Sequence, residues 1–545
     1  MKNKHPVAGG KLGTLSLLLF LCGIILSALV MPMLALLKRA FEFEPFYAGF
    51  AKELSNTITR QAIFNSVWVT FAASAVAVIF AFFFAYMVHF KLSGRLQKFF
   101  RFFAVLPILL PSITYGVVII YLFGKMGVFT RLLGFQLPIY GPLGIIMGSF
   151  FYAFPTAFLL MSQAFANIDA RYLEAAQTLG ASRFSQFKDI ELPIMKYAVF
   201  SSFMVSFTMI FTDYGISVSV GGNFATLPLL FYKKVIGLLD FSRGAIFGIF
   251  ILVPAMGIYL LDVLYFNKKR ASSAQNIRPV PVSRMNILQK TGMVAITLMI
   301  VIPLIVVCIA PFIKGWPYEP TLTFDHFSRI LKSGKLGQLI WNSVIISFLS
   351  GLFGMALAFI SGYIHVRAKG GFGPLKKAIH GLYMVSLAVP GLALGLAYAL
   401  FFKGTPLYNT AAILVIVNIV HFFGSPYMMF VSHFKLLNPN LEDTCRSLGG
   451  KWYHIIRDVI LPNSRRVVLD TFVYVFTNSM ITISAVSMLF SSKTMLLSLQ
   501  ITTFNDQSAM ESAIAVSLVI FVINAIAKLL QSIRTDRGRK QKDPA

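Results

Sequence analysis

Long apolar runs are the feature of this sequence that most restricts its fold. Stretches of about 20 mostly apolar residues, long enough to cross a bilayer as a helix, recur along the whole chain, for example at 14–37, 195–222 and 410–433. Hydrophobic residues make up 57% of the 545 residues and charged residues only 12%, which leaves too little polar surface for a soluble chain of this length. The sequence therefore predicts an all-α membrane protein with many spans.

Twelve segments have the length and composition of membrane spans. They are 14–37, 62–89, 100–124, 140–165, 195–222, 244–266, 292–313, 339–365, 378–402, 410–433, 466–490 and 512–531. Because the number is even, both termini lie on the same side of the membrane. About two thirds of the Lys and Arg residues fall in loops on that side, and positively charged loops remain in the cytoplasm. We therefore expect both termini to be cytoplasmic.

The formal net charge of +28 is the feature that most suggests a nucleic-acid partner. Lys and Arg lie in short loops between apolar segments, however, rather than along one soluble face. The charge therefore fits a membrane topology, and we expect the lipid bilayer, not nucleic acid, as the environment. The basic start of the chain precedes an apolar stretch longer than the core of about 7–15 residues in a signal peptide, which predicts a retained first helix.

The chain also repeats itself. Residues 64–86 match residues 341–363, and Pro111 matches Pro390, at separations that stay between 277 and 279. Chance pairing of apolar segments would not keep the separation constant. The repeat predicts two structurally similar units in one chain.

The two units define the predicted domain organisation. Residues 1–266 form a first half of six spans and residues 292–545 a second half of six. A basic cytoplasmic linker that contains Ser and Pro, residues 267–291, joins them. Since both halves begin on the inside, they are parallel repeats about an axis along the membrane normal rather than inverted ones.

A polar loop after the fourth predicted span carries the most specific motif. It reads DARYLEAAQTLGASRFSQFKDIELP over residues 169–193. An acidic first residue can cap a short helix, two alanines leave room for a close partner surface, and a glycine permits a backbone reversal that other residues resist. The defining positions are Asp169, Glu174, Ala175, Ala176, Gly180 and Pro193.

The motif recurs after the tenth predicted span, in residues 438–462. The spacing from glycine to proline is thirteen in both copies. A single Glu-Ala-Ala triplet carries little information, because many helices contain one, and an ordinary cytoplasmic loop is the alternative interpretation. Two copies at equivalent places on the positively charged side favour a docking function. The counterpart residues are Asp443, Thr444, Cys445, Gly449 and Pro462.

These residues resemble the EAA loop of binding-protein-dependent ABC importer permeases, and the resemblance extends over essentially the whole chain. The fused layout is similar to that of the permeases for ferric iron, thiamine and phosphonates. The first copy matches the motif fully, whereas the second replaces Glu by Asp and Ala-Ala by Thr-Cys. We therefore expect changes at Glu174 and Gly180 to impair transport more than changes at Asp443 or Gly449.

The resemblance implies the type I importer permease fold in a bacterial inner membrane, with transport by alternating access. It also implies two ATP-binding cassette ATPase subunits, each docked on one motif loop, and a separate extracytoplasmic solute-binding protein. The sequence contains no Gly-x4-Gly-Lys-Ser/Thr phosphate loop. We therefore expect a transport subunit that is not an enzyme and binds no cofactor, with ATP and Mg²⁺ held by the partner subunits.

Ionisable residues inside predicted spans are few, and such residues are candidates for function. Asp213 in the fifth span is the most notable, with Asn478 as its counterpart in the repeat. A structural hydrogen bond between helices explains Asp213 equally well, and a structural role is the favoured interpretation for His421. No residues have the spacing of a metal site. The candidate residues of the path that the substrate takes through the membrane, called path residues below, are Tyr115, Asp213, Tyr214, Ser217, His421, Asn478 and Ser479.

Two other classes of protein share some of these features. A secondary transporter driven by an ion gradient explains twelve helices in two halves, but gives no reason for the matched loops. A membrane-embedded enzyme would gather carboxylates, His or Cys at one depth, whereas Asp213 and Asp262 belong to opposite ends of neighbouring spans. The substrate stays open among ferric iron, thiamine, a phosphonate and other small solutes.

Overall fold

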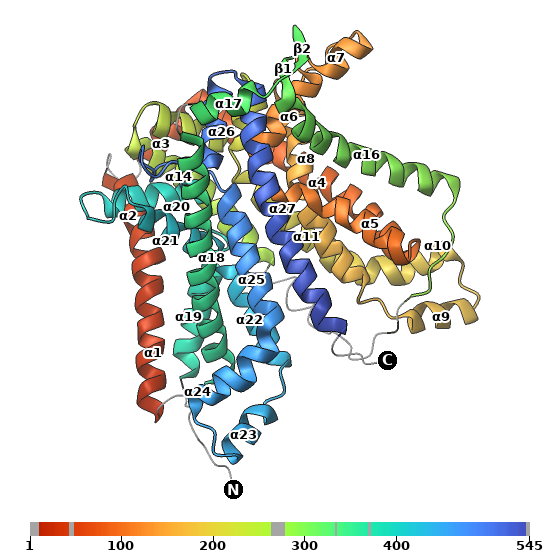
Figure 1. Cartoon of the computed structure of the whole chain (residues 1–545), viewed down its shortest axis with the longest axis vertical. Coiled ribbons are helices and arrows are strands. Elements are labelled where there is room, and N and C mark those ends of the chain that lie inside the picture. Colours follow the sequence, from red (N-terminus) through yellow and green to blue (C-terminus); the bar gives the residue numbers. More distant parts are fainter. Residues whose placement is uncertain are drawn as a thin grey trace.

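The described residues lie almost entirely in helices, most of which run between two opposite ends of the molecule (Figure 1). This computed structural model describes residues 10–42, 48–262, 278, 280–332, 335–368 and 372–540. Much of the predicted linker, residues 267–277 and 279, lies outside the described residues. The division into halves at this linker therefore stays a prediction.

Long helices make up most of each half. In the first half they are α1 (Gly10–Ile25), α2 (Met31–Glu42), α4 (Thr57–Phe90), α5 (Gly94–Val105), α6 (Ser112–Phe123), α8 (Pro142–Phe165), α11 (Leu192–Phe211) and α14 (Phe241–Leu261). In the second half they are α16 (Ile287–Ile309), α18 (Lys335–Arg367), α19 (Gly373–Val385), α20 (Gly391–Phe402), α21 (Ala411–Phe422), α22 (Gly424–Leu436), α25 (Leu461–Ile481) and α27 (Met510–Lys540).

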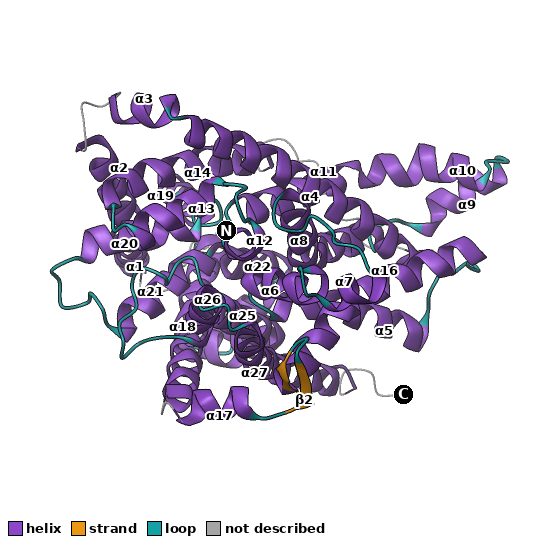
Figure 2. Ribbon diagram, turned by 90° about the horizontal axis from the view of Figure 1, so that it is seen from above, coloured by secondary structure: helices purple, strands orange, loops and turns teal. Residues whose placement is uncertain are grey.

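Short elements connect the long helices. They are α3 (Ala48–Ser55), α7 (Val128–Leu133), α9 (Ala170–Thr178), α10 (Arg183–Gln186), α12 (Gly215–Val220), α13 (Leu227–Tyr232), α17 (Asp325–Lys332), α23 (Asn440–Ser447), α24 (Trp452–His454) and α26 (Leu497–Asp506). Two strands, β1 (Ile313–Gly315) and β2 (Glu319–Leu322), form a small antiparallel hairpin. Figure 2 shows this hairpin at the edge of the molecule beside α27.

The structure is consistent with the predicted twelve spans but does not reach that count. By length and apolar composition, nine helices of the described residues can cross a membrane, or ten when the pair α21–α22, bent by 53°, counts as one span. The two remaining predicted spans correspond to α19–α20 and α25. The first is broken between Val385 and Gly391, and the second carries Arg465, Arg466 and Asp470.

Proline interrupts the predicted span at 100–124. The helix α5 ends at Val105, a single 3₁₀ turn follows, and α6 begins only after Pro111. Proline has no N–H to donate and disfavours helical backbone at the residue before it. The Pro107 carbonyl oxygen accepts from the Leu110 amide at 3.2 Å and also from the Tyr115 phenolic hydroxyl at 2.5 Å, which links α6 to the 3₁₀ turn.

The predicted spans at 195–222 and 466–490 are not continuous helices either. The first ends at Phe211 and resumes as α12, and the second ends at Ile481. In the first half the Asp213 carboxylate accepts a hydrogen bond from the Ile216 amide at 3.1 Å. A side-chain acceptor at this place offers the backbone an alternative to helical hydrogen bonding and starts a new helix.

The same polar contacts recur in both halves. Asn65 donates to the Ala225 carbonyl oxygen at 2.9 Å, and the Ser66 hydroxyl accepts from the Leu227 amide at 2.7 Å. These bonds hold the irregular chain before α13 against α4. The equivalent bonds in the second half join Asn342 to Met495 at 3.1 Å and Leu497 to Ser343 at 2.8 Å.

The first helices of the two halves are exchanged. Helix α2 packs against α20 of the second half and α1 against α19, whereas α16 packs against α4, α5 and α6 of the first half (Figure 1). The Tyr398 hydroxyl of α20 donates to the Ala28 carbonyl oxygen between α1 and α2 at 2.5 Å. The two halves of the sequence are therefore not two separate packing units.

Candidate functional site

The first motif loop folds as a capped helix followed by a reversal. The Asp169 carboxylate accepts a hydrogen bond from the Arg171 amide at 3.0 Å, the N-cap of α9. Its hydrogen bonds with the Arg171 guanidinium hold the pKa of Asp169 below its ordinary value. Helix α9 ends at Thr178, and Gly180 adopts φ 81°, the left-handed conformation that favours glycine.

The second motif loop has the same backbone plan. Gly449 adopts φ 82° after α23. In both loops a short helix, α10 or α24, then leads through a π-helical turn into a long helix whose second residue is Pro193 or Pro462. Proline suits the first turn of a helix, where the missing N–H has no intrahelical acceptor.

Corresponding motif residues have corresponding exposures. Glu174 and Ala175 of the first loop are exposed and Ala176 is half-buried. Their counterparts repeat this order, with Asp443 and Thr444 exposed and Cys445 half-buried. Glu174 and Ala175, and their counterparts Asp443 and Thr444, therefore lie on the outer side of each short helix, where a partner can reach them.

Both loops also expose apolar side chains that sequence reasoning missed. Leu179 is 87% exposed and Leu448, at the equivalent position, is 84% exposed. Exposed apolar groups gathered at one place mark a surface for a partner. The signal that could have found them is the apolar residue directly before each motif glycine. Further exposed members are Tyr172 and Phe184 in the first loop and Leu441, Trp452 and Tyr453 in the second.

A buried ion pair anchors the second loop. Glu442 of α23 lies 3.3 Å from the Arg367 guanidinium at the end of α18, and their side chains are 7% and 11% exposed. The Arg367 guanidinium also donates to the Leu437 carbonyl oxygen, directly before α23. Burial raises the pKa of Glu442, and the Arg367 and Arg446 charges oppose that rise.

The first loop has apolar residues at these two places. Counting from the motif and from the long helix before it, Leu173 corresponds to Glu442 and Phe90 to Arg367. Leu173 is buried, whereas Glu174 forms an ion pair with Arg278 at 3.1 Å. The second loop instead pairs Asp443 with Arg446 of its own helix at 3.3 Å.

Two of the candidate path residues come together. Asp213 and Ser217 line a small pocket inside the first half, which the hydroxyl-bearing side chains of Ser66, Thr70, Ser149 and Thr226 also line. The Ser112 hydroxyl donates to the Asp213 carboxylate at 2.5 Å. Asp213 thus bonds across the break between α11 and α12, and its carboxylate lines a pocket of mixed hydroxyl-bearing and apolar side chains.

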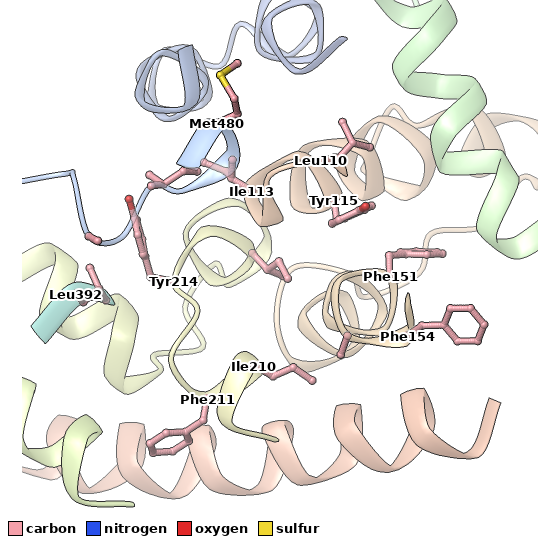
Figure 3. Packing of buried hydrophobic residues seen from close by; sticks show 14 of the residues in the cluster. Leu110, Ile113, Tyr115, Phe151, Phe154, Ile210, Phe211, Tyr214, Leu392 and Met480 are labelled. Carbon is pink, nitrogen blue, oxygen red and sulfur yellow. The ribbon is translucent and has the colours of Figure 1, made fainter. Parts of the chain in front are cut away.

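The other path candidates lie apart from this pocket. Tyr115 is buried beside Phe151, with ring centroids 5.9 Å apart, and Tyr214 reaches towards the second half while its ring stacks on Tyr232 at 4.8 Å (Figure 3). Asn478 donates to the Tyr474 carbonyl oxygen of its own helix at 2.8 Å. His421 is half-buried and Ser479 is buried.

When the two halves are aligned on the first residues of α11 and α25, Asp213 has a different counterpart from Asn478, which the local sequence suggests. Counted from Pro193 and Pro462, Asp213 corresponds to Thr482, one turn beyond Asn478. The packing agrees with this count. A Cβ atom at Gly116 would meet Ser219 and Ile216, and one at Gly395 would meet Ala485, the residue that this count pairs with Ile216.

Comparison with known proteins identifies the family. The profile of the family described as binding-protein-dependent transport system inner membrane component matches the chain twice, over residues 77–269 and 368–539. The chain belongs to this family. The two matches agree with the fused repeat, and they make the chain a transport permease that spans the membrane many times.

Individual relatives are more distant. The permease is 25% identical over 507 residues to a ferric transport system permease protein of Actinobacillus pleuropneumoniae. This alignment covers 88% of this chain and 72% of the relative. It is 28% identical over 218 residues to a sulfate transport system permease protein of Salmonella typhimurium, in an alignment that covers 39% of this chain and 76% of the relative. A bacterial alginate ABC transporter structure aligns with a TM-score of 0.40 and 15% identity, over 45% of this chain and 91% of that one.

We predict that valine at Gly180 or Gly449 destabilises its loop by about 1–2 kcal/mol, because a β-branched residue resists the left-handed backbone. The two φ values differ by one degree, so the two effects should be equal. Asparagine, which tolerates this conformation, is the matched control and should disturb each loop less. Hydrogen exchange of residues 170–178 and 440–447 measures both. Protection in the valine variants equal to that of the wild type would contradict the assigned backbone.

We predict that Glu442→Ala lowers the stability of the permease by about 3–5 kcal/mol, because it leaves the buried Arg367 charge without its partner. The double variant Arg367→Phe with Glu442→Leu copies Phe90 and Leu173 of the first half and should recover most of the loss. Thermal unfolding in detergent measures the three forms. A double variant as unstable as Glu442→Ala would show that the pair does not account for the loss.

Proposed function

We propose that this permease belongs to an ATP-driven importer that carries ferric iron delivered by a solute-binding protein. The support is the Actinobacillus pleuropneumoniae relative, named for ferric transport, which aligns with both halves of this chain over 88% of its length. Family membership also favours this driving force over an ion gradient, since the family is that of binding-protein-dependent transport. Transport then proceeds by alternating access between the two sides of the membrane.

The observation that carries the proposal is the pair of matched loops at one end of the molecule. Helices α9 and α23 both lie at the end where α1 begins and α27 ends (Figure 1). Each presents an exposed leucine, Leu179 or Leu448, beside a glycine in the left-handed conformation. Two ATPase subunits, each docked on one loop, would cover these apolar side chains. This end is then cytoplasmic, and both termini with it.

The opposite end offers a surface for the solute-binding protein. Helix α7 and the β1–β2 hairpin protrude there (Figure 1), and the Trp316 indole N–H donates to the Met126 carbonyl oxygen at 2.9 Å between them. The exposed apolar residues of this surface are Leu132, Leu133, Tyr318, Leu322 and Phe324, between 54% and 85% exposed. Leu132 and Leu133 end the candidate span Ser112–Leu133, whereas Tyr318 and Leu322 of the hairpin lie beyond the candidate spans. Apolar side chains as exposed as those of the hairpin are suited to a protein partner.

Asp213 is the path residue with the chemistry that a ferric ion needs. Carboxylate and hydroxyl oxygens suit hard cations, and the Asp213 pocket holds one carboxylate among several hydroxyls. Asp213 also accepts a hydrogen bond from the Ile216 amide at the break between α11 and α12. Movement of either helix would therefore alter access of a solute to the Asp213 pocket. We assign Asp213 and Ser217 to the path, and treat Tyr115 as a packing residue.

We predict that glutamate at Leu179 or Leu448 weakens association with the ATPase subunit by about tenfold or more, because burying an apolar leucine contributes about 1.5–3 kcal/mol and a buried charge opposes docking. Leu132→Glu, at the opposite end and 75% exposed, is the matched control and should leave association unchanged. Co-purification of the ATPase from detergent measures the effect. If both loop variants bound the ATPase as tightly as the wild type, the proposed docking of the ATPase subunits on Leu179 and Leu448 would be wrong.

We predict ATP-dependent uptake of radioactive iron by proteoliposomes that contain the permease, its ATPase and its solute-binding protein. Supplied ferric citrate should be taken up only when the binding protein is present, and sulfate should not compete. The transport should persist with an ionophore and stop without ATP. Uptake of sulfate instead of iron would show that the proposed substrate is wrong. Uptake that an ionophore abolishes would favour a secondary transporter driven by an ion gradient.

A further inference from the structure

The chain before α16 lies against the first motif loop. Arg278 contacts this loop twice, since its carbonyl oxygen accepts from the Ala170 amide at 2.9 Å and its guanidinium pairs with Glu174 at 3.1 Å. A few residues further on, the Ser283 amide donates to the Phe90 carbonyl oxygen at 2.9 Å. The Lys91 ammonium group donates to the Ser283 hydroxyl at 2.8 Å. Residue 278 and residues 280–286 are called the strap below.

The strap joins the same two places that Arg367 joins in the second half. There, the Arg367 guanidinium at the end of α18 bonds to Leu437 and pairs with Glu442, so it holds α18 to α23. The short helices α9 and α23 are called the docking helices below. In the first half the end of the long helix is Phe90, which has no side-chain hydrogen-bonding group. The strap bonds to its carbonyl oxygen and to the start of α9 instead. The two halves therefore reach the same connection by different means.

The strap also leads directly into the second half. Asn286 caps α16, since its carboxamide oxygen accepts from the Gln289 amide at 2.8 Å, and the Gln289 side chain accepts from the Asn286 amide at 3.2 Å. Helix α16 begins at Ile287, four residues after Ser283. The short segment from Ser283, which is bonded to Phe90 of α4, to the start of α16 leaves little slack between these two helices. Arg278, at the other end of the strap, is bonded to α9.

We propose that the strap positions the first docking helix and ties its movement to the first helix of the second half. Arg278 and Ser283 are positioning residues, because they act on α9 and α4 rather than on a transported solute. The mechanical part of this inference rests on the proposed docking of an ATPase on α9. The positioning part does not, because it concerns contacts within this chain alone.

Hydrogen exchange of the permease without partners tests the positioning. Arg278→Ala removes the ion pair to Glu174, and Ser283→Pro removes the amide that bonds to Phe90. In each variant, residues 170–178 should exchange about two- to tenfold faster, the loss expected for one or two hydrogen bonds. Residues 440–447, held by the pair of Arg367 and Glu442, should exchange as in the wild type. Unchanged exchange at 170–178 in both variants would overturn the proposal.

Reconstituted transport tests the coupling. Arg278→Ala should lower uptake per ATP hydrolysed by about two- to tenfold while the ATPase still co-purifies. Arg278→Lys keeps the positive charge beside Glu174 and should retain more of the coupling than Arg278→Ala. Arg284→Ala changes an exposed arginine of the strap that forms no ion pair within the described part of the chain, so it should match the wild type. Equal coupling in Arg278→Ala and Arg284→Ala would overturn the mechanical role, whereas failure of the wild-type chain to bind the ATPase would instead contradict the docking.

Discussion

The need to satisfy every backbone N–H and C=O group without water governs this structure. In the hydrocarbon of a bilayer each unpaired group is costly, so continuous helices are the default and any break requires a local partner. The permease breaks several of its spans, and side chains bond to the irregular backbone at three places. Tyr115 bonds to the Pro107 carbonyl oxygen, Asp213 accepts from Ile216, and the Asn65 carboxamide bonds to Ala225. The side chains that make irregular backbone possible are thus among the most polar in the spans.

This constraint explains how far the sequence could predict the structure. Apolar length predicted the helices, and the motif glycines predicted the reversals that Gly180 and Gly449 make. The break after Phe211 was missed because the flanking segments are apolar enough for one span, although Asp213 accepts from the Ile216 amide and Gly215 disfavours a helix there. The exchange of α1–α2 and α16 between halves was also out of reach, because a repeated sequence does not say which copy a helix packs against.

The candidate site divides in the same way. The motif gave the positions of both loops and the exposed Glu174 and Asp443. It did not give the anchors behind them, since Arg367 and Arg278 lie outside the motif and far from it in sequence. A fused chain allows this difference between anchors. Its two halves need not be identical, so one copy can hold its docking helix through a buried ion pair and the other through the segment that joins the halves.

The exchanged first helices set the order in which the permease can be completed during synthesis. Ala28 and Tyr398 are 370 residues apart along the chain and are joined by a hydrogen bond. At about 5–20 residues per second, helices α1 and α2 enter the membrane roughly 20–75 s before their packing partner α20 exists. During that interval the face that α20 will cover is open to lipid or to other membrane proteins. Helices α1 and α2 are therefore made well before the contacts with α20 that complete their packing can form.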